Sequence, residues 1–569
     1  MATQYDRHGL PEKKAAWLEN VQPVGPNNLL TVPAPAASAL SSLAGETIVK
    51  QYYFNFGSSV DYVINFCASG AAYAVTNPGG TVTKFANAGT FSSTPDATQL
   101  GTSRLLMADA QAGYCTWDTH TFVQQGGVSP NVNIITPGAG YTSNPSVTIS
   151  GGSGTGATIS TTVSGGIIAT AVLSSTGTGY KAADNITVVV TGGGASTTAS
   201  IAAHVWPIFT TNPQTIAYFS GRVWLAATNI INYSGTGAAA TYGGNGYDDF
   251  TNADAAGSTT INDPDLIHNI TALRALNNYL FIVGDNSVKQ IGNVSVSGST
   301  TNFTTVTLTS DNGTTFRDTI VSYNRLMLFA NKVGVYAVFG SSVQKISEDM
   351  DGIFRSIDFT QNPVSAVNDI NNIHCYLLLV RYQDPAVGTR SLILSFAEKK
   401  WFVCSQGNSL TFITTANIAG QSFTFGTSGN DVTKILFDPK ITVSIKIQTA
   451  LTAHGAIWGQ KRTVRWATAQ NTAEADTVTL TVESERNSQP FAYTLGAVIT
   501  WTNATGGVIQ WQNASLQNIN WTTGGYTYKT SQVNVSGNYL GATLTGTVKG
   551  YTFIGLALEY EPSAIFTAS

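Results

Sequence analysis

Histidine, serine and glycine-rich motifs would indicate metal binding, nucleophilic catalysis or phosphate binding in this chain. The six histidines are His8, His120, His204, His268, His374 and His454. None belongs to an H-E-x-x-H motif or a close pair that could begin a zinc site. The chain also lacks a G-x-S-x-G nucleophile turn and a G-K-[ST] phosphate loop. The sequence therefore predicts no catalytic, cofactor-binding or metal-binding residues, and a protein that is not an enzyme.

One turn-like string resembles a known motif. Residues 309–316, TSDNGTTF, approximate the Asp-box of sialidase-like β-propellers, S-x-D-x-G-x-T-W, with Thr309 in place of Ser and Phe316 in place of Trp. In that family the box forms a hairpin turn away from the active site. A match therefore indicates propeller architecture and carries no catalytic role.

A second string gathers carboxylates. Glu348, Asp349 and Asp351 precede Gly352, and carboxylates at this density are the ligands that Ca²⁺ prefers. The twelve-residue EF-hand spacing with its terminal glutamate is missing, however. We expect a solvated turn in which Gly352 adopts a positive φ.

The cysteines and the apolar runs bear on export and membranes. Cys67, Cys115, Cys375 and Cys404 are far apart and have no C-x-x-C spacing, which favours buried free thiols over a disulfide or a metal site. The first ten residues contain no apolar core of a secretory signal, so Sec export is not expected. No apolar run reaches the roughly 20 residues of a membrane span.

The composition favours a rigid β protein that does not bind nucleic acid tightly. Of the 569 residues, 43% are hydrophobic and only 11% charged, less than half of the roughly 25% usual in soluble domains. Hydroxyls, amides and 56 glycines supply the polarity. The net charge of −4 and the lack of a basic run argue against tight phosphate binding.

Apolar strands followed by tight turns recur along the chain. The first strands of these hairpins are marked by Val63, Leu105, Val223, Leu280, Leu326, Cys375 and Phe423. Neighbouring markers are 42 to 57 residues apart, except for one separation of 118 that falls to 41 when the 77 residues 128–204 are removed. A period of roughly 40–50 residues is typical of β-propeller blades. We therefore predict an all-β protein with a β-propeller of six to seven blades, built from residues 46–127 and 205–439.

Three further regions complete the predicted domains. Residues 1–45 form an N-terminal extended arm with a short helix over 11–20. Residues 128–204 form an inserted Gly/Thr-rich β module, a tandem duplication of about 39 residues in which Gly140-Tyr141 recurs as Gly179-Tyr180. Residues 440–569 form a C-terminal β-sandwich or platform domain. This last region holds five of the ten tryptophans, Trp458, Trp466, Trp501, Trp511 and Trp521.

A family resemblance runs in pieces from about 50 to 127 and from 205 to the end. Residues 334–354, GVYAVFGSSVQKISEDMDGIF, resemble the segment that crosses from one blade to the next in tail nozzle proteins of short-tailed bacteriophages, also called tail tubular protein B or packaged-DNA stabilisation proteins. Supporting strings lie at 95–118, 391–403 and 536–563. These strings are packing signatures and contain no catalytic residue.

The resemblance implies a structural virion protein of the phage tail, assembled in the cytoplasm of the host bacterium. It implies a homohexameric ring that continues the channel of the portal and the adaptor, or head-to-tail connector, protein. Such a ring retains packaged double-stranded DNA, conducts it non-specifically during ejection and anchors tail fibres or spikes. We expect its lumen to lack a net basic lining, because each neutralised phosphate would slow transit.

Contacts of such a ring are assigned from the same sequence. The C-terminal domain and residues 9–25 are the candidates for inter-subunit contacts, and the insert is expected to touch the host, a fibre or a neighbouring virion protein. Two alternatives stay open. One is a carbohydrate-binding or glycan-degrading β-propeller acting on the host surface, which exposed Trp or Tyr around a pocket with paired carboxylates would support. The other is a bacterial adhesin or another secreted β protein.

Overall fold

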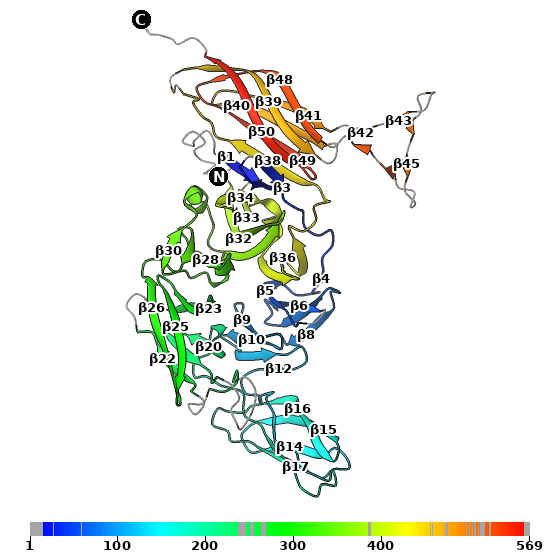
Figure 1. Ribbon diagram of the computed structural model, residues 1–569, viewed down its shortest axis with the longest axis vertical. Coiled ribbons are helices and arrows are strands. Elements are labelled where there is room, and N and C mark those ends of the chain that lie inside the picture. Colours follow the sequence, from blue (N-terminus) through cyan, green and yellow to red (C-terminus); the bar gives the residue numbers. More distant parts are fainter. Residues whose placement is uncertain are drawn as a thin grey trace.

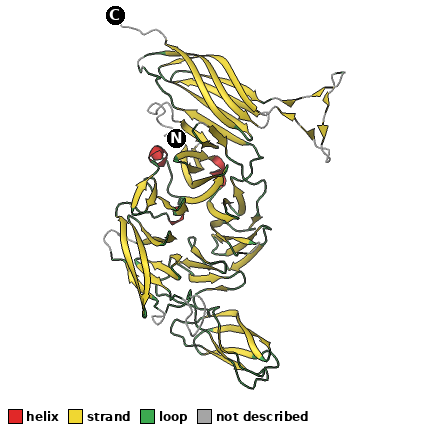
Figure 2. Ribbon diagram, in the orientation of Figure 1, coloured by secondary structure: helices red, strands yellow, loops and turns green. Residues whose placement is uncertain are grey.

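The structure is a computed structural model in which strands predominate. It describes residues 15–26, 28–57, 60–236, 246–250, 255–262, 269–384, 388–455, 457, 459–472, 476–496, 498–499, 501–502, 505, 508–509, 511–512, 518–519, 521–522 and 525–562. Helical segments in this part of the chain are short: η3 (Arg317–Thr319), η4 (Glu348–Met350), α1 (Asp351–Phe354) and η5 (Ser405–Ser409) (Figure 2). The all-β prediction is confirmed. No helix over these residues is long and apolar enough to cross a bilayer.

The middle of the chain folds into successive antiparallel sheets of four strands, which we number as units. Unit one is β5 (Ile48–Phe54), β6 (Asp61–Cys67), β7 (Ala72–Asn77) and β8 (Val82–Ala86). Unit two is β9 (Asp96–Leu100), β10 (Arg104–Asp109), β11 (Gly113–Trp117) and β12 (Phe122–Val123). Unit three is β19 (Thr215–Phe219), β20 (Arg222–Ala227), β21 (Ile230–Tyr233) and β22 (Gly257–Thr260). Unit four is β23 (Ile270–Leu276), β24 (Tyr279–Gly284), β25 (Val288–Ser297) and β26 (Thr300–Thr309).

Three more units follow. Unit five is β27 (Val321–Tyr323), β28 (Leu326–Ala330), β29 (Val335–Phe339) and β30 (Ser342–Lys345). Unit six is β31 (Val364–Ile370), β32 (Ile373–Asp384), β33 (Gly388–Ala397) and β34 (Lys400–Cys404). Unit seven is β35 (Phe412–Ile418), β36 (Gln421–Ser428) and β37 (Asp431–Ile435), completed by β4 (Ser41–Ser42) from the N-terminal arm.

Tight turns set the register of these hairpins. The two-residue turns Asn277-Asn278, Asn324-Arg325 and Asn371-Asn372 each join the first and second strands of a unit, and both residues of each turn have positive φ. Two positive φ values give a turn whose twist matches that of paired strands, and Asn tolerates this conformation better than most residues. The local sequence therefore fixes where these strands end.

The units pack on one another in chain order and close into a ring (Figure 1). A buried apolar cluster joins each unit to the next, and another joins unit seven to unit one. At that last junction Tyr53 stacks on Phe425 with ring centroids 6.2 Å apart. The arm also closes the ring, because the backbone N–H of Leu40 donates to the Val432 carbonyl at 2.7 Å beside the β4–β37 pairing. We refer to units one to seven as the ring.

The short helix predicted over 11–20 is wrong for the residues that the structure describes. Residues 11–14 lie outside them, and Ala15–Glu19 forms strand β1. β1 pairs in parallel with β34 and antiparallel with β38 (Val443–Thr449). Ala16, Trp17 and Leu18 are all buried, because β1 lies inside a sheet, and this packing overrides local helix propensity. Ala16, Trp17 and Leu18 are thus enclosed by their own subunit, and the contact between subunits predicted for residues 9–25 stays a prediction for the rest of that segment.

Two larger sheets contain the C-terminal strands. β1 continues the unit-six sheet in the order β31-β32-β33-β34-β1-β38-β49-β40-β41, with β40 (Asp476–Ser484), β41 (Ser488–Leu495) and β49 (Leu540–Val548). A five-stranded sheet has the order β2-β3-β50-β39-β48, with β2 (Val21–Val24), β3 (Asn28–Thr31), β39 (Lys461–Thr472), β48 (Gly525–Gly537) and β50 (Thr552–Pro562). Leu480 and Val535 of the two sheets belong to one buried cluster.

The tryptophans of this region have different environments. Trp466 is buried, whereas Trp511 is 53% exposed. Trp458 and the side chains of Trp501 and Trp521 lie outside the described residues. Three two-stranded pairs project from the C-terminal sheets (Figure 1). They are β42 (Val498–Ile499) with β47 (Trp521–Thr522), β43 (Trp501–Thr502) with β44 (Val508–Ile509), and β45 (Trp511–Gln512) with β46 (Asn518–Ile519).

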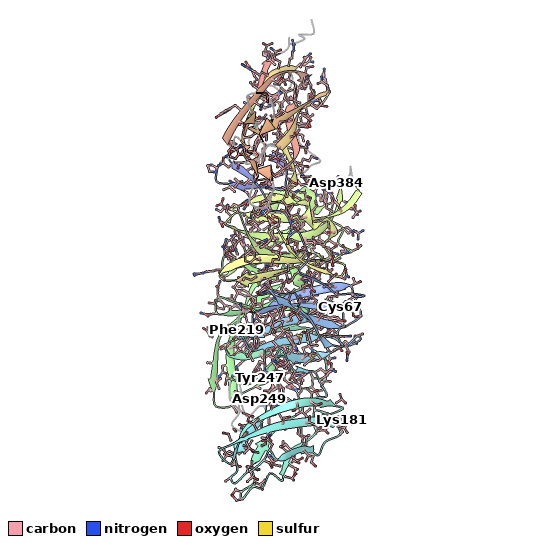
Figure 3. All side chains as sticks on the ribbon, turned by 90° about the vertical axis from the view of Figure 1, so that its right-hand side faces the viewer. Cys67, Lys181, Phe219, Tyr247, Asp249 and Asp384 are labelled. Atoms are coloured by element: carbon pink, nitrogen blue, oxygen red, sulfur yellow. The ribbon has the colours of Figure 1, made fainter. Side chains whose placement is uncertain are left out.

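The insert folds beside unit two, at the end of the molecule opposite the C-terminal sheets (Figure 1). β13 (Asn133–Thr136) pairs with β18 (Ser200–Ala202), and a four-stranded sheet has the order β16 (Ile167–Thr178), β15 (Thr155–Ser164), β14 (Ser146–Ser150), β17 (Thr187–Thr191). The side view separates Lys181 of the insert from Asp384 of unit six by the length of the ring (Figure 3).

The two halves of the duplication interlock. Tyr141 packs so closely on Gly193 that a Cβ there would lie 2.8 Å from its ring, and Tyr180 packs on Gly154 with a corresponding distance of 2.3 Å. Each tyrosine thus fills a space left by a glycine of the other half. This exchange explains why the Gly-Tyr pair occurs twice.

Candidate functional site

A cavity of about 570 Å³ lies on the axis of the ring. The first strand of every unit contributes to its wall, through Lys50, Asp96, Ile216, Leu273, Val321, Ser365 and Phe412. Apolar residues line part of this wall, but five charged side chains also reach it: Lys50, Asp96, Arg274, Arg317 and Asp318. None of these five side chains was predicted from the sequence to belong to a site.

Asp96 is the centre of one half of this charged cluster. Its carboxylate accepts from both terminal nitrogens of Arg274, at 2.9 and 3.1 Å, and from the Thr215 hydroxyl at 2.6 Å. The backbone N–H of Ile216 donates to it at 3.2 Å. This two-pronged ion pair with Arg274 joins units two and four, and the Thr215 hydroxyl adds unit three. Asp96 is only 3% exposed, so its carboxylate has little contact with water.

Lys50 and Arg317 form the other half. The Lys50 ammonium donates to Asp318 at 2.6 Å, which ties unit one to the segment before unit five. Arg317 donates to the backbone carbonyls of Gln214 and Thr94, ahead of units three and two. The axis is thus crossed by side chains from opposite sides of the ring.

Burial and charge act in opposite directions on these groups. Burial alone would raise the pKa of Asp96, but Arg274, Arg317 and Lys50 outweigh it and hold that pKa well below its usual range. Burial lowers the pKa of Lys50, and Asp318 opposes this shift only in part. Burial, with help from Asp96, raises the pKa of Tyr52 to about 12. A carboxylate with a lowered pKa and four donors is a poor general acid or base near neutral pH.

The Asp-box-like string lies at a different place from that in sialidase-like propellers. It follows β26 and leads into η3, so it joins unit four to unit five and does not turn a hairpin. The buried Thr314 hydroxyl donates to the Ala330 carbonyl at 2.6 Å, and Phe316 stacks on Phe359 at 5.5 Å. Asp311 is exposed. The string serves packing between units.

The carboxylate string is helical. Glu348 and Asp349 lie in η4, and Asp351 and Gly352 begin α1. The positive φ predicted for Gly352 is wrong, because a helical residue has negative φ. Asp351 pairs with Lys345 at 2.6 Å, whereas Met350 and Phe354 turn into the core. Across the part of the chain that the structure describes, no three His, Cys, Asp or Glu side chains are grouped so as to hold a metal ion.

The string that carries the family resemblance spans the last two strands of unit five and the first part of the connection to unit six. It contains β29 and β30 and then η4 and α1. The buried Ser347 hydroxyl accepts from the Val335 N–H at 2.8 Å, which fixes the link against the strand it left. The apolar residues Met350, Ile353 and Phe354 are buried in the same cluster as Val335 and Leu377. The string is thus a packing element between two units.

The cysteine and histidine side chains that the structure describes form no further site. All four cysteines are free and buried, as expected from sequence. Burial raises the pKa of the Cys67 and Cys404 thiols to about 12, so they stay protonated near neutral pH. His8 and His268 lie outside the described residues. His120, His204, His374 and His454 lie on four separate segments, and His204 and His374 pair with Asp248 and Asp369 at 3.1 and 2.6 Å.

Sequence reasoning missed the axial cluster because its members are single charges on strands far apart in the chain. One signal was available. In a chain with 11% charged residues, Lys50, Asp96 and Arg274 each lie on the first strand of a unit, next to apolar residues. Comparing these strands would have brought the charges to one axis.

Comparisons with known proteins do not identify a family. No family model and no curated protein matches the chain. Similar solved structures include the computationally designed Ika8 protein, with 12% identity, 70% of this chain and 99% of that chain covered, and a TM-score of 0.31. BamB from Moraxella catarrhalis has 12% identity, covers 69% of this chain and 97% of its own, and has a TM-score of 0.32. These low scores transfer no function to this chain.

Proposed function

We propose that this chain is the subunit of a phage tail nozzle, in which the seven units are the blades of a β-propeller. The observation that carries the proposal is the position of residues 334–354. The resemblance implies a segment that crosses from one blade to the next, and the string leaves unit five and ends at Phe354, within the connection that leads to β31 of unit six. Its Ser347 and Met350 are buried and pack within the protein, as expected of a string with a structural role.

The path of DNA in this proposal lies between subunits. The axis of a single ring is crossed by Lys50–Asp318 and Arg274–Asp96, and its cavity of about 570 Å³ cannot hold a duplex. A channel must therefore form where several subunits surround a common axis, through contacts that close by rotation. The exposed Trp511 and Tyr528 make the C-terminal region our candidate for those contacts.

Rigid coupling between domains suits a part that bears load. The nine-stranded sheet runs without a break from unit six through β1 into the C-terminal strands. Force applied to those strands would pass to the ring through backbone hydrogen bonds. A flexible linker would not transmit it in this way.

A glycan-degrading propeller is the weaker alternative. Asp96 and Asp318 line one cavity with Tyr52 and Tyr218, but both carboxylates are held in ion pairs. A glycosidase needs one carboxylic acid with a raised pKa. The pKa of Asp96 is lowered, which is the opposite of that requirement.

Sedimentation of the purified chain, alone and with a phage adaptor protein, tests the proposal. We expect a species near six times the 59.9 kDa of one chain, formed alone or on the adaptor. A stable monomer that does not join the adaptor would refute the assignment. Binding to a host glycan by that monomer would favour the sugar-binding propeller.

A further inference from the structure

The axial cavity has an excess of positive charge. Its charged wall residues are three cations, Lys50, Arg274 and Arg317, and two carboxylates, Asp96 and Asp318. Arg274 is neutralised by Asp96 and Lys50 by Asp318. The terminal nitrogens of Arg317 donate to backbone carbonyls, which hold the guanidinium in place without cancelling its charge. One positive charge is left over among the side chains of this wall.

Hydrogen-bonding capacity at the wall is also unused. Within the described part of the chain, Arg317 Nε and Gln51 Oε1 are buried and have no hydrogen-bond partner. Gln51 is only 2% exposed, and its amide nitrogen already donates to Asn65 at 2.8 Å. Lys50 has three donors, and one bond to Asp318 accounts for one of them.

We propose that this cavity binds an oxyanion, a phosphate or a carboxylate, that pairs with Arg317 and Lys50. Oxygen atoms of such an ion accept from the Lys50 ammonium and lie beside the uncompensated charge of Arg317. Arg317 is already oriented by its two carbonyls, so little side-chain entropy is lost on binding. The cavity volume of about 570 Å³ exceeds that of inorganic phosphate and leaves room for a sugar ring. This proposal does not depend on the nozzle assignment.

Two ligand sources share this chemistry, and two probes separate them. Isothermal titration calorimetry of the full chain at pH 7.5 would use sodium phosphate for a free oxyanion and sodium glucuronate for an acidic sugar. Sodium chloride at matched ionic strength controls for general screening. We expect saturable binding of one or both probes near one site per chain, and the tighter probe identifies the source.

Variants locate the site. Arg317→Gln removes the unpaired charge and should weaken binding at least tenfold. Arg325→Gln removes an exposed cation from the β27–β28 turn and should leave it unchanged. Arg317→Gln also loses the two contacts with backbone carbonyls, so a second variant is needed. Gln51→Glu adds a negative charge to the cavity wall with almost no change in side-chain volume, and it should abolish binding. Equal binding by wild type and both cavity variants, or heats no larger than those of chloride, would overturn the proposal.

Discussion

Asp96→Asn removes the charge at the centre of the axial cluster, and its cost can be worked from the contacts. The two bonds from Arg274 lose their ionic character, whereas an amide oxygen can still accept from Thr215 and Ile216. Breaking one partner of a buried pair costs about 3–5 kcal/mol. Since Arg274 is 26% exposed and two acceptor contacts remain, we expect the lower end, about 3 kcal/mol.

Equilibrium urea unfolding followed by tryptophan fluorescence measures this cost, because Trp117, Trp206 and Trp224 are buried in the ring. The matched control is Asp311→Asn, which neutralises an exposed carboxylate and should change stability by less than about 0.5 kcal/mol. The same free-energy change in both variants would refute the argument that the axial ion pairs hold the ring together.

The pH dependence has a defined sign. The folded-state pKa of Asp96 is lowered, so its stabilisation is full above the unfolded value of about 3.9 and is lost as pH falls below it. Between pH 5 and pH 3 the wild type should therefore lose more stability than Asp96→Asn. Parallel losses would show that Asp96 is not charged in the folded state at low pH.

Three other perturbations test separate parts of the fold. Gly80→Ala places a Cβ 2.2 Å from the Leu40 carbonyl, in the N-terminal arm just before β4, at a φ of +67°, and should cost about 2–3 kcal/mol in urea unfolding. Gly89→Ala, where a Cβ would have nothing within 4 Å, should cost about 1 kcal/mol. Ser347→Ala leaves the Val335 N–H unpaired and should cost about 1–3 kcal/mol, against almost nothing for the exposed Ser342→Ala. Fluorescence anisotropy with duplex DNA should detect no binding at physiological salt. Salt-dependent micromolar binding would contradict the expectation that the lumen lacks a net basic lining.

The repeated units could be found from sequence because their second strands are buried on both faces. Val63, Leu105, Val223, Leu280, Leu326, Cys375 and Phe423, chosen as markers of the repeat, lie on β6, β10, β20, β24, β28, β32 and β36, the second strand of each unit. Such strands are short apolar runs with Asn- or Gly-bearing turns beside them. Their spacing is therefore visible without knowledge of tertiary contacts.

The features that were missed depend on partners far away in the chain. Trp17 looked helical because its neighbours are good helix formers, but its strand is completed by Val403 and Ile447 on either side. Arg274 and Asp96 are 178 residues apart and meet only when the ring closes. Gly352 differs from its predicted turn because it lies in the short helix α1, whose Ile353 and Phe354 are buried against residues distant in the chain. Closure of a ring is a global event, so a charge on a first strand can be placed near the axis from sequence, but its partner across the ring cannot.

Electron microscopy of the assembled particle tests the central claim most directly. The nozzle proposal predicts a closed hexamer with a central opening wide enough for duplex DNA. Each of the six copies keeps its own closed ring of seven units, and these rings lie around the central opening. Isolated particles of single-chain size, or an assembly without an axial opening, would contradict it.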